Sequence, residues 1–276
     1  MGNHPMPTTW KTWISQLRRW GGRCLRLGRP DPRPTGSAGI DQLGHREYVG
    51  GRWEEIGKLQ FEFLVARGLR PEHVLLDVAC GSLRAGIHLI PYLNAGHYWG
   101  LEKEAELVEA GLSRELDPAI RSTQQPQFLI NAEFDVTGIG QRIDYIWIHS
   151  LLTHLPLLDI QHCLQQLRPV AQQTTVCYAT YFETLIVHNN QRQAHDHESF
   201  FYTREELGRC AFEAGWVTDF IGDWGHPRGQ RMLKLMPLGE SSLHAPREDS
   251  RALFRLGKST QHSVVLKPFD KPVSDE

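Results

Sequence analysis

The sequence lacks three features, each of which would have indicated a class of protein. It has no long uncharged apolar run, no C-x-x-C pair and no glycine-rich G-x-G-x-x-G turn. Without such a run there is no candidate transmembrane helix, since a span needs about 20 apolar residues. The five cysteines are odd in number and widely spaced, which favours buried, reduced thiols in a cytosolic protein over a disulfide framework. The missing glycines would leave the pyrophosphate of a dinucleotide poorly bound.

Length and charge predict one α/β domain flanked by two tails. The chain has 276 residues, and 40% of them are hydrophobic, which is enough for one core. We expect an N-terminal segment and linker over 1–36, the domain over 37–238 and a polar tail over 239–276. Residues 1–34 carry seven basic side chains and one acid, whereas the remainder is net negative, so the body has no charge signature of a nucleic-acid-binding surface.

The N-terminal segment has the pattern of a basic amphipathic helix. Its arginines fall largely on the side opposite an apolar stripe of Trp10, Trp13, Ile14, Leu17, Trp20, Cys24 and Leu27. One interpretation is peripheral contact of residues 10–27 with an anionic membrane surface. The alternatives are packing on the body or on a partner subunit, or a disordered tail. Arginines interrupt the apolar stretch, which argues against a secretory signal, so we expect a cytoplasmic protein, peripheral to the inner face of a membrane under the first interpretation.

Residues 73–103 form the unit around which the chain is organised. Val74–Ala79 is a short apolar run typical of a buried parallel strand. A small-residue turn and an amphipathic stretch follow, and then comes a second strand that ends at Glu102. A strand, tight turn, helix, strand and acid in this order receive an adenosine ligand at the mouth of an open α/β sheet. The acid can accept hydrogen bonds from both ribose hydroxyls.

The rest of the domain alternates predicted helices and strands. We expect helices over 48–70, from after Glu102 to about Leu116, from Pro156 to Pro169, and after the capping box of Thr203 and Glu206. Further strands are predicted over 127–131, 143–149, 174–181, 217–221 and 231–235. Residues 117–126, polar and containing two prolines, are predicted to form a loop. The polar segment 186–199 holds three histidines and is predicted to cover the substrate. His195 and His197 alone are weak evidence for a metal, so none is predicted.

Several stretches in this order resemble the class I S-adenosylmethionine (SAM)-dependent methyltransferases. They are 75–82 (Leu-Leu-Asp-Val-Ala-Cys-Gly-Ser), 99–102 (Trp-Gly-Leu-Glu) and 143–150 (Ile-Asp-Tyr-Ile-Trp-Ile-His-Ser). Residues 48–57, 150–156 and 225–230 resemble a bacterial subgroup of that family acting on small molecules or glycans. The resemblance implies a doubly wound, mostly parallel seven-stranded Rossmann-like sheet with helices on both faces, its last strand antiparallel, and SAM as cofactor. The sequence departs from the family pattern at Ala79, where glycine is usual, and at Leu83, where a small residue is frequent.

The resemblance also implies the site residues. Those expected to bind the cofactor are Asp77, Ala79, Cys80, Gly81, Glu102, Lys103, Asn131 and His149. Those expected to bind substrate are Tyr48, Ser150, Glu183, His226 and Arg228. His149, at the carboxyl end of a strand facing the transferred methyl group, is the candidate general base, since the pKa range of histidine suits that task. The alternative is a strand-end histidine that only shapes the pocket.

The sequence therefore predicts a SAM-dependent methyltransferase acting on a small-molecule or glycan acceptor, with transfer to oxygen favoured. One alternative keeps the fold without catalysis, as a SAM-binding or scaffold protein, because of the departure at Ala79. A second places a methyltransferase on a membrane surface with a lipid-linked acceptor. A third, a nicotinamide-dependent oxidoreductase, is disfavoured by the missing glycines. The sequence names neither the acceptor nor the oligomeric state.

Overall fold

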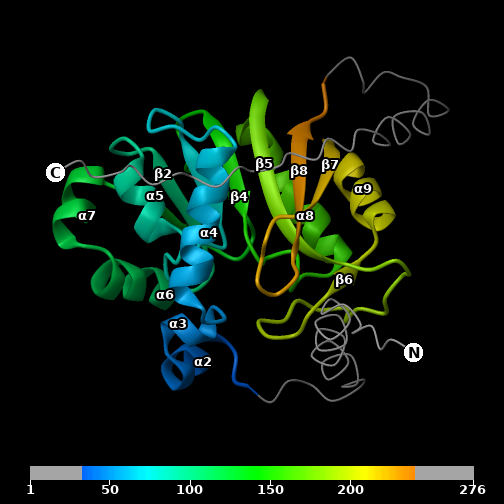
Figure 1. The fold of residues 1–276 in the computed structure, drawn as a ribbon, viewed down its shortest axis with the longest axis horizontal. Helices are drawn as coiled ribbons and strands as arrows, with labels where there is room; N and C mark the ends of the chain where they lie inside the picture. The colour runs from blue at the N-terminus through cyan, green and yellow to red at the C-terminus, as the bar shows by residue number, and fades with distance from the viewer. Residues whose placement is uncertain (1–32, 240–276) are drawn as a thin grey trace, which may run out of the picture.

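Seven strands form one mixed sheet in the order β3-β2-β1-β4-β5-β8-β7 in the computed structural model, which describes residues 33–239 (Figure 1). All pairings along this path are parallel except those of β8, which runs antiparallel to both β5 and β7. A short strand, β6, pairs with the end of β5. The strands are β1 Leu75–Val78, β2 Tyr98–Glu102, β3 Gln127–Ile130, β4 Ile143–Ile148, β5 Ala171–Glu183, β6 Phe201–Tyr202, β7 Trp216–Asp223 and β8 Arg231–Pro237. The predicted doubly wound, mostly parallel sheet is confirmed.

Helices cover both faces of this sheet, and further helices lie next to the carboxyl ends of its parallel strands. They are α2 Gly36–Leu43, α3 His45–Tyr48, α4 Trp53–Ala66, α5 Gly86–Tyr92, α6 Ala105–Ala110, α7 Pro118–Gln124, α8 Leu157–Leu167 and α9 Arg204–Glu213, with a π turn at Gly111–Glu115 and a 3-10 turn at Arg168–Val170. None of the helices within 33–239 combines the length and apolar character needed to cross a membrane. The predicted basic helix over 10–27 and the tail beyond residue 239 lie outside the described residues.

Side chains along the central strands point alternately to the two faces of the sheet, so two apolar cores form, one on each face. Leu76 of β1 and Ile146 of β4 point into the layer that contains α8 and α9. Leu75 and Trp147 point to the other side, into the layer of α4 and α5. Successive side chains of a strand face opposite ways, so a strand covered on both faces must be apolar almost throughout. This is why the short runs around β1 and β4 are so rich in Leu, Ile and Val.

The carboxyl ends of the parallel strands face α2 and α3 (Figure 1). From β1 the chain first moves outward to β2 and β3, then returns to β4 on the other side of β1. Loops leaving β1 and β4 therefore diverge at this edge, which is where open α/β sheets bind ligands. Tyr48 and Ile40 make a small apolar contact with Leu107, and this contact fixes α2 and α3 against α6.

Two expectations about helices were wrong in detail. Residues 117–126 are not a loop, because α7 occupies most of them. Pro118 stands at the first helical position, where its missing N–H costs nothing, and Asp117 caps the helix by accepting the Ala119 amide at 2.7 Å. The helix predicted over 48–70 begins only at Trp53, because Gly50, Gly51 and Arg52 all have positive φ.

The capping box of α9 gives a test of local stability. The Glu206 amide donates to Thr203 Oγ1 at 3.2 Å, and the Thr203 amide donates to the Glu206 carboxylate at 2.9 Å. We predict that Thr203→Ala lowers the free energy of unfolding by about 1 kcal/mol, because it removes the acceptor for a helix-end amide. Denaturant unfolding measures this. The control is Thr123→Ala in α7, whose hydroxyl donates to the Ala119 carbonyl within the helix and which should cost nothing. Equal losses in the two variants would contradict the prediction.

Candidate functional site

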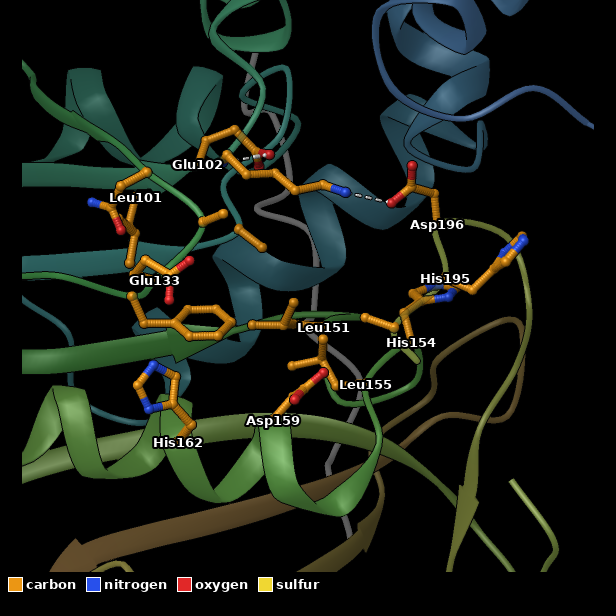
Figure 2. Close-up of a pocket in the computed structure, with 16 residues that line it drawn as sticks. Leu101, Glu102, Glu133, Leu151, His154, Leu155, Asp159, His162, His195 and Asp196 are labelled. Carbon is orange, nitrogen blue, oxygen red and sulfur yellow. Dashed lines mark hydrogen bonds and ion pairs between the residues drawn. The ribbon is translucent and has the colours of Figure 1, made fainter. Parts of the chain in front are cut away.

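A cavity of about 370 Å³ opens at the carboxyl ends of β1, β2 and β3 (Figure 2). Its size falls within the range of ~300–1,000 Å³ typical of small-molecule sites. The lining residues are Ala79, Leu101, Glu102, Lys103, Asn131, Ala132, Glu133, Phe134, Leu151, His154, Leu155, Asp159, His162, Ala194, His195 and Asp196. The lining combines apolar side chains with charged and polar ones, which suits a small ligand that has both apolar and polar parts.

Glu102 supplies a fixed carboxylate to this cavity. It is the last residue of β2 and is only 6% exposed. One carboxylate oxygen accepts the Gly81 amide at 2.9 Å, and the other accepts the amides of Lys103 and Glu104 at 2.9 and 3.2 Å. Burial raises the pKa of Glu102 and these amides lower it, with burial the larger effect. The three amides use three of the roughly four lone-pair sites of the carboxylate, so the oxygen bonded to Gly81 can still accept one hydroxyl.

The turn after β1 adopts a backbone conformation that suits glycine. Ala79, Gly81 and Leu83 have φ of +58°, +57° and +67°. A Cβ on Gly81 would lie 3.0 Å from Val49 Cγ1, so this glycine also permits a close approach of the segment after α3. The two non-glycine residues stand where the resembling family usually has glycine or a small residue. Ala79 and Leu83 each adopt this left-handed conformation at a cost of roughly 1–2 kcal/mol.

Beneath the turn, Asp77 is 3% exposed and accepts the Tyr98 hydroxyl at 2.8 Å. Burial raises the pKa of Asp77 to about 7 against the opposing effect of that hydrogen bond. Cys80 is equally enclosed, and burial raises the pKa of its thiol well above the usual range, so it is not a nucleophile. These two residues support the turn and are not among those lining the cavity.

Asp196 closes the cavity from the segment that follows β5 (Figure 2). Its carboxylate lies 2.6 Å from Lys103 Nζ and accepts the Tyr48 hydroxyl at 2.5 Å and the Gly36 amide at 3.2 Å. Burial alone would raise the pKa of Asp196, but the hydrogen bonds from Lys103 and Tyr48 outweigh it and lower the pKa to about 2. This carboxylate therefore ties three distant parts of the chain together over the predicted cofactor site.

The segment around Asp196 is also held by further hydrogen bonds to other parts of the domain. The His195 amide donates to the His154 carbonyl at 3.1 Å, and His154 Nδ1 lies 2.7 Å from the Glu198 carbonyl. His195 accepts backbone amides, and His197 contacts the Pro34 carbonyl at 2.9 Å. Each of the two histidines considered for a metal thus serves the loop's own structure. Among residues 33–239 no group of three or more metal-ligating side chains occurs.

A second group of functional side chains lies at the ends of β4 and the β7–β8 connection. Here His149 Nε2 lies 3.3 Å from His226 Nε2, and His149 Nδ1 lies 3.4 Å from Arg84 Nη2. Burial, followed by the charges of Arg84, His226 and Arg228, lowers the pKa of His149 well below its usual value. Burial and the charges of Arg84 and Arg228 lower the pKa of His226 to about 3. Both rings are therefore neutral at pH 7.

The remaining predicted residues separate into those that join these groups and those that do not. Ser150 lies beside the histidine pair, with its hydroxyl 2.9 Å from the buried Gln230 amide. Asn131 lines the cavity, but its side chain is bonded to the backbone of Asp135 on both sides. Glu183 is not a lining residue, since it forms ion pairs with Arg204 and Arg231 at the end of β5.

Sequence reasoning missed two residues that the structure brings forward, Arg84 and Asp196. Arg84 directly follows the turn and was the nearest cation to it in sequence, which could have marked it. No local signal marked Asp196, because its partners lie 93 and 148 residues away along the chain.

Comparison with known proteins supports the fold. No protein-family model matches the chain. Magnesium protoporphyrin IX methyltransferase (ChlM) from Synechocystis PCC 6803 with bound S-adenosylhomocysteine (SAH) superimposes with a TM-score of 0.52 at 15% identity, over 73% of this chain and 95% of that one. DhpI, in a complex with SAM and HEP, gives 0.52 at 14% identity over 71% and 93%. The CcbJ methyltransferase from Streptomyces caelestis gives 0.52 at 12% over 69% and 92%. The chain has the fold of class I SAM-dependent methyltransferases.

The Asp196 contacts predict a pH-dependent stability. Its pKa is below the ordinary value of 3.8, so its contribution is complete above pH 3.8 and is lost as pH falls toward 2. We expect Asp196→Asn to lower the free energy of unfolding by about 1 kcal/mol at pH 7, a figure discounted for solvent screening. At pH 3 the difference from wild type should be roughly half as large. Denaturant unfolding at both values tests this, with Asp41→Asn on the exposed face of α2 as control. A difference independent of pH would contradict the prediction.

Proposed function

We propose that this protein is a SAM-dependent methyltransferase that moves a methyl group to an oxygen of a small-molecule or glycan acceptor. The observation that carries the proposal is the buried Glu102 carboxylate at the end of β2, fixed by the Gly81 amide and facing an apolar cavity. The acceptor site that the three amides leave on Glu102 can accept a ribose hydroxyl, and the apolar part of the cavity lining can contact an adenine ring. The fold of the solved structures that resemble this chain agrees with this assignment.

The residues present fit an adenosyl ligand. Leu101 and Phe134 from one side and Leu151 and Leu155 from the other provide the apolar surface, while Glu102 provides the acceptor. The first residue of the turn from Ala79 to Leu83 carries only a methyl group as its side chain. Asp196 and Lys103 form a polar cover that would exclude water from a bound nucleoside.

SAM supplies an already activated methyl group on a sulfonium, so the protein's task is chiefly to position the acceptor. The acceptor oxygen forms a bond to the methyl carbon while the carbon–sulfur pair returns to sulfur, and the hydroxyl proton must leave. His149 lies at the end of β4 with Ser150 beside it, and we assign this place to the acceptor. As a neutral ring, His149 can receive a proton, although burial and nearby cations oppose the charge that it would gain.

Cofactor binding gives the direct test. We expect Glu102→Ala to weaken binding of SAM by about tenfold to a hundredfold, roughly 1–3 kcal/mol, because a ribose hydrogen bond to a charged group is lost. Calorimetric titration with SAM measures this, and titration with NADH checks the oxidoreductase alternative. The matched control is Glu109→Ala, an exposed acid on α6 that should bind SAM as wild type does. Binding of NADH but not SAM by the wild type would overturn the proposed function.

A further inference from the structure

Two arginines and two histidines form a buried cluster beside the place assigned to the acceptor. Arg84, His149 and His226 are 7%, 8% and 5% exposed, and Arg228 is half-buried. Arg84 comes from the turn between β1 and α5, His149 directly follows β4, and the other two come from the β7–β8 connection. We call these four residues the Arg–His cluster.

The Arg–His cluster holds more hydrogen-bond donors than acceptors. Arg84 Nη2 faces His149 Nδ1 at 3.4 Å, and the backbone amide of Arg228 faces His226 Nδ1 at 3.3 Å. Both are donors, so each requires a ring nitrogen with a lone pair. A neutral histidine then carries its only proton on Nε2, which would leave two N–H groups facing each other across the 3.3 Å between the rings. All three contacts cannot be satisfied together, and Arg84 Nε has no hydrogen-bond partner among the described residues.

The charges around the two rings have the same sign. Arg84 and Arg228 both disfavour protonation of His149 and of His226, and Arg52 adds to the effect on His226. Asp77 is the acid that acts on Arg84, but its own pKa is raised to about 7, so it is only partly ionised at neutral pH. Buried cations are costly unless an anion accompanies them. Both the hydrogen-bond accounting and the charge therefore call for an acceptor with negative charge.

Backbone carbonyls cover the cluster. Arg84 Nη1 donates to the carbonyls of Val49 and Gly51 at 3.1 and 3.0 Å, and Arg228 Nη2 donates to the carbonyl of Gly50. A Cβ on Gly50 would lie 2.6 Å from Arg228 Nη1, so only glycine allows this approach. The carbonyls satisfy N–H groups but carry no net charge. Through these hydrogen bonds the guanidinium groups of Arg84 and Arg228 both contact residues 49–51, the segment that directly follows Tyr48.

We propose that the methyl acceptor carries an anionic group, a carboxylate or a phosphate, and that the Arg–His cluster binds it. The inference rests on the proposed function and names the substrate class of the same site. Oxygens of such a group would accept from the guanidinium N–H groups and from a ring N–H, which resolves the donor excess. An anion that accepts from Arg84 would also free the Nδ1 lone pair of His149, and its negative charge would favour protonation of that ring during transfer to oxygen.

The test is a calorimetric titration of the SAH-saturated protein with three matched sugars: glucuronate, glucose 6-phosphate and glucose. We expect at least one anionic sugar to bind and glucose to bind at least tenfold more weakly, and which anion binds distinguishes carboxylate from phosphate. Arg228→Gln should weaken the anionic sugar by about tenfold or more and leave SAH affinity within about twofold. Arg228→Lys keeps the charge without the forked geometry and should fall between the two. The control is Arg209→Gln, an exposed residue of α9.

Each other outcome counts against the inference. It is overturned if neither anionic sugar binds, if glucose binds equally well, or if Arg228→Gln leaves anion binding unchanged while the variant unfolds at the wild-type temperature. Loss of SAH binding in Arg228→Gln would mean that the cluster holds the carboxylate of the cofactor, which also overturns it. If the wild type fails to bind SAH at all, the proposed function fails first, and that result is separate from a failure confined to the sugars.

Discussion

The parallel pairing of β1 with β2 and β4 is the constraint on which the site depends. Parallel strands bring their carboxyl ends to one edge, and here that edge collects the turn after β1, Glu102 after β2 and His149 after β4. The hydrogen bond from the Gly81 amide to Glu102 then joins the first two of these strand ends. Because the strands are buried on both faces, packing fixes their positions. The polar groups at the strand ends are therefore held in fixed positions as well.

Two polar regions flank the strand ends and differ in character. Around Asp196 the charges are paired, since a carboxylate meets an ammonium, a phenol and an amide, and the pKa of the acid falls accordingly. Around His149 the charges have one sign, and burial adds to their effect. The first region ties distant segments together, whereas the second gathers buried groups whose pKa values are strongly shifted. Such shifts are typical of functional sites.

Much of the sheet could be predicted from the sequence because its signals are local. The apolar runs at β1 and β4, the acid at the end of β2 and the capping box of α9 each occupy a few consecutive residues. The two prolines within 117–126 predict a loop, whereas Pro118 stands at the first position of a helix, where proline is favourable. The sequence did not predict β6, Phe201–Tyr202, because two residues carry too little pattern.

The site was harder to predict, because its contacts join distant segments. Glu102 and Ala79 follow from a compact motif, and both line the cavity. Arg84 turns toward His149, 65 residues away, and nothing in its neighbourhood indicates that direction. Glu183 has the right position along β5, yet nearby arginines engage it in ion pairs. The sequence shows which residue ends a strand. Ion pairing with neighbouring charged residues then decides whether the side chain of that residue is available to a ligand.

The contacts of Asp196 also bear on how the molecule assembles. Its partners Tyr48 and Lys103 precede it by 148 and 93 residues, so closing these loops costs more entropy than forming the neighbouring strand pairs. We therefore expect the contacts of Asp196 over the cavity to form later in folding than the pairing of β1 with β2, which joins segments much closer along the chain.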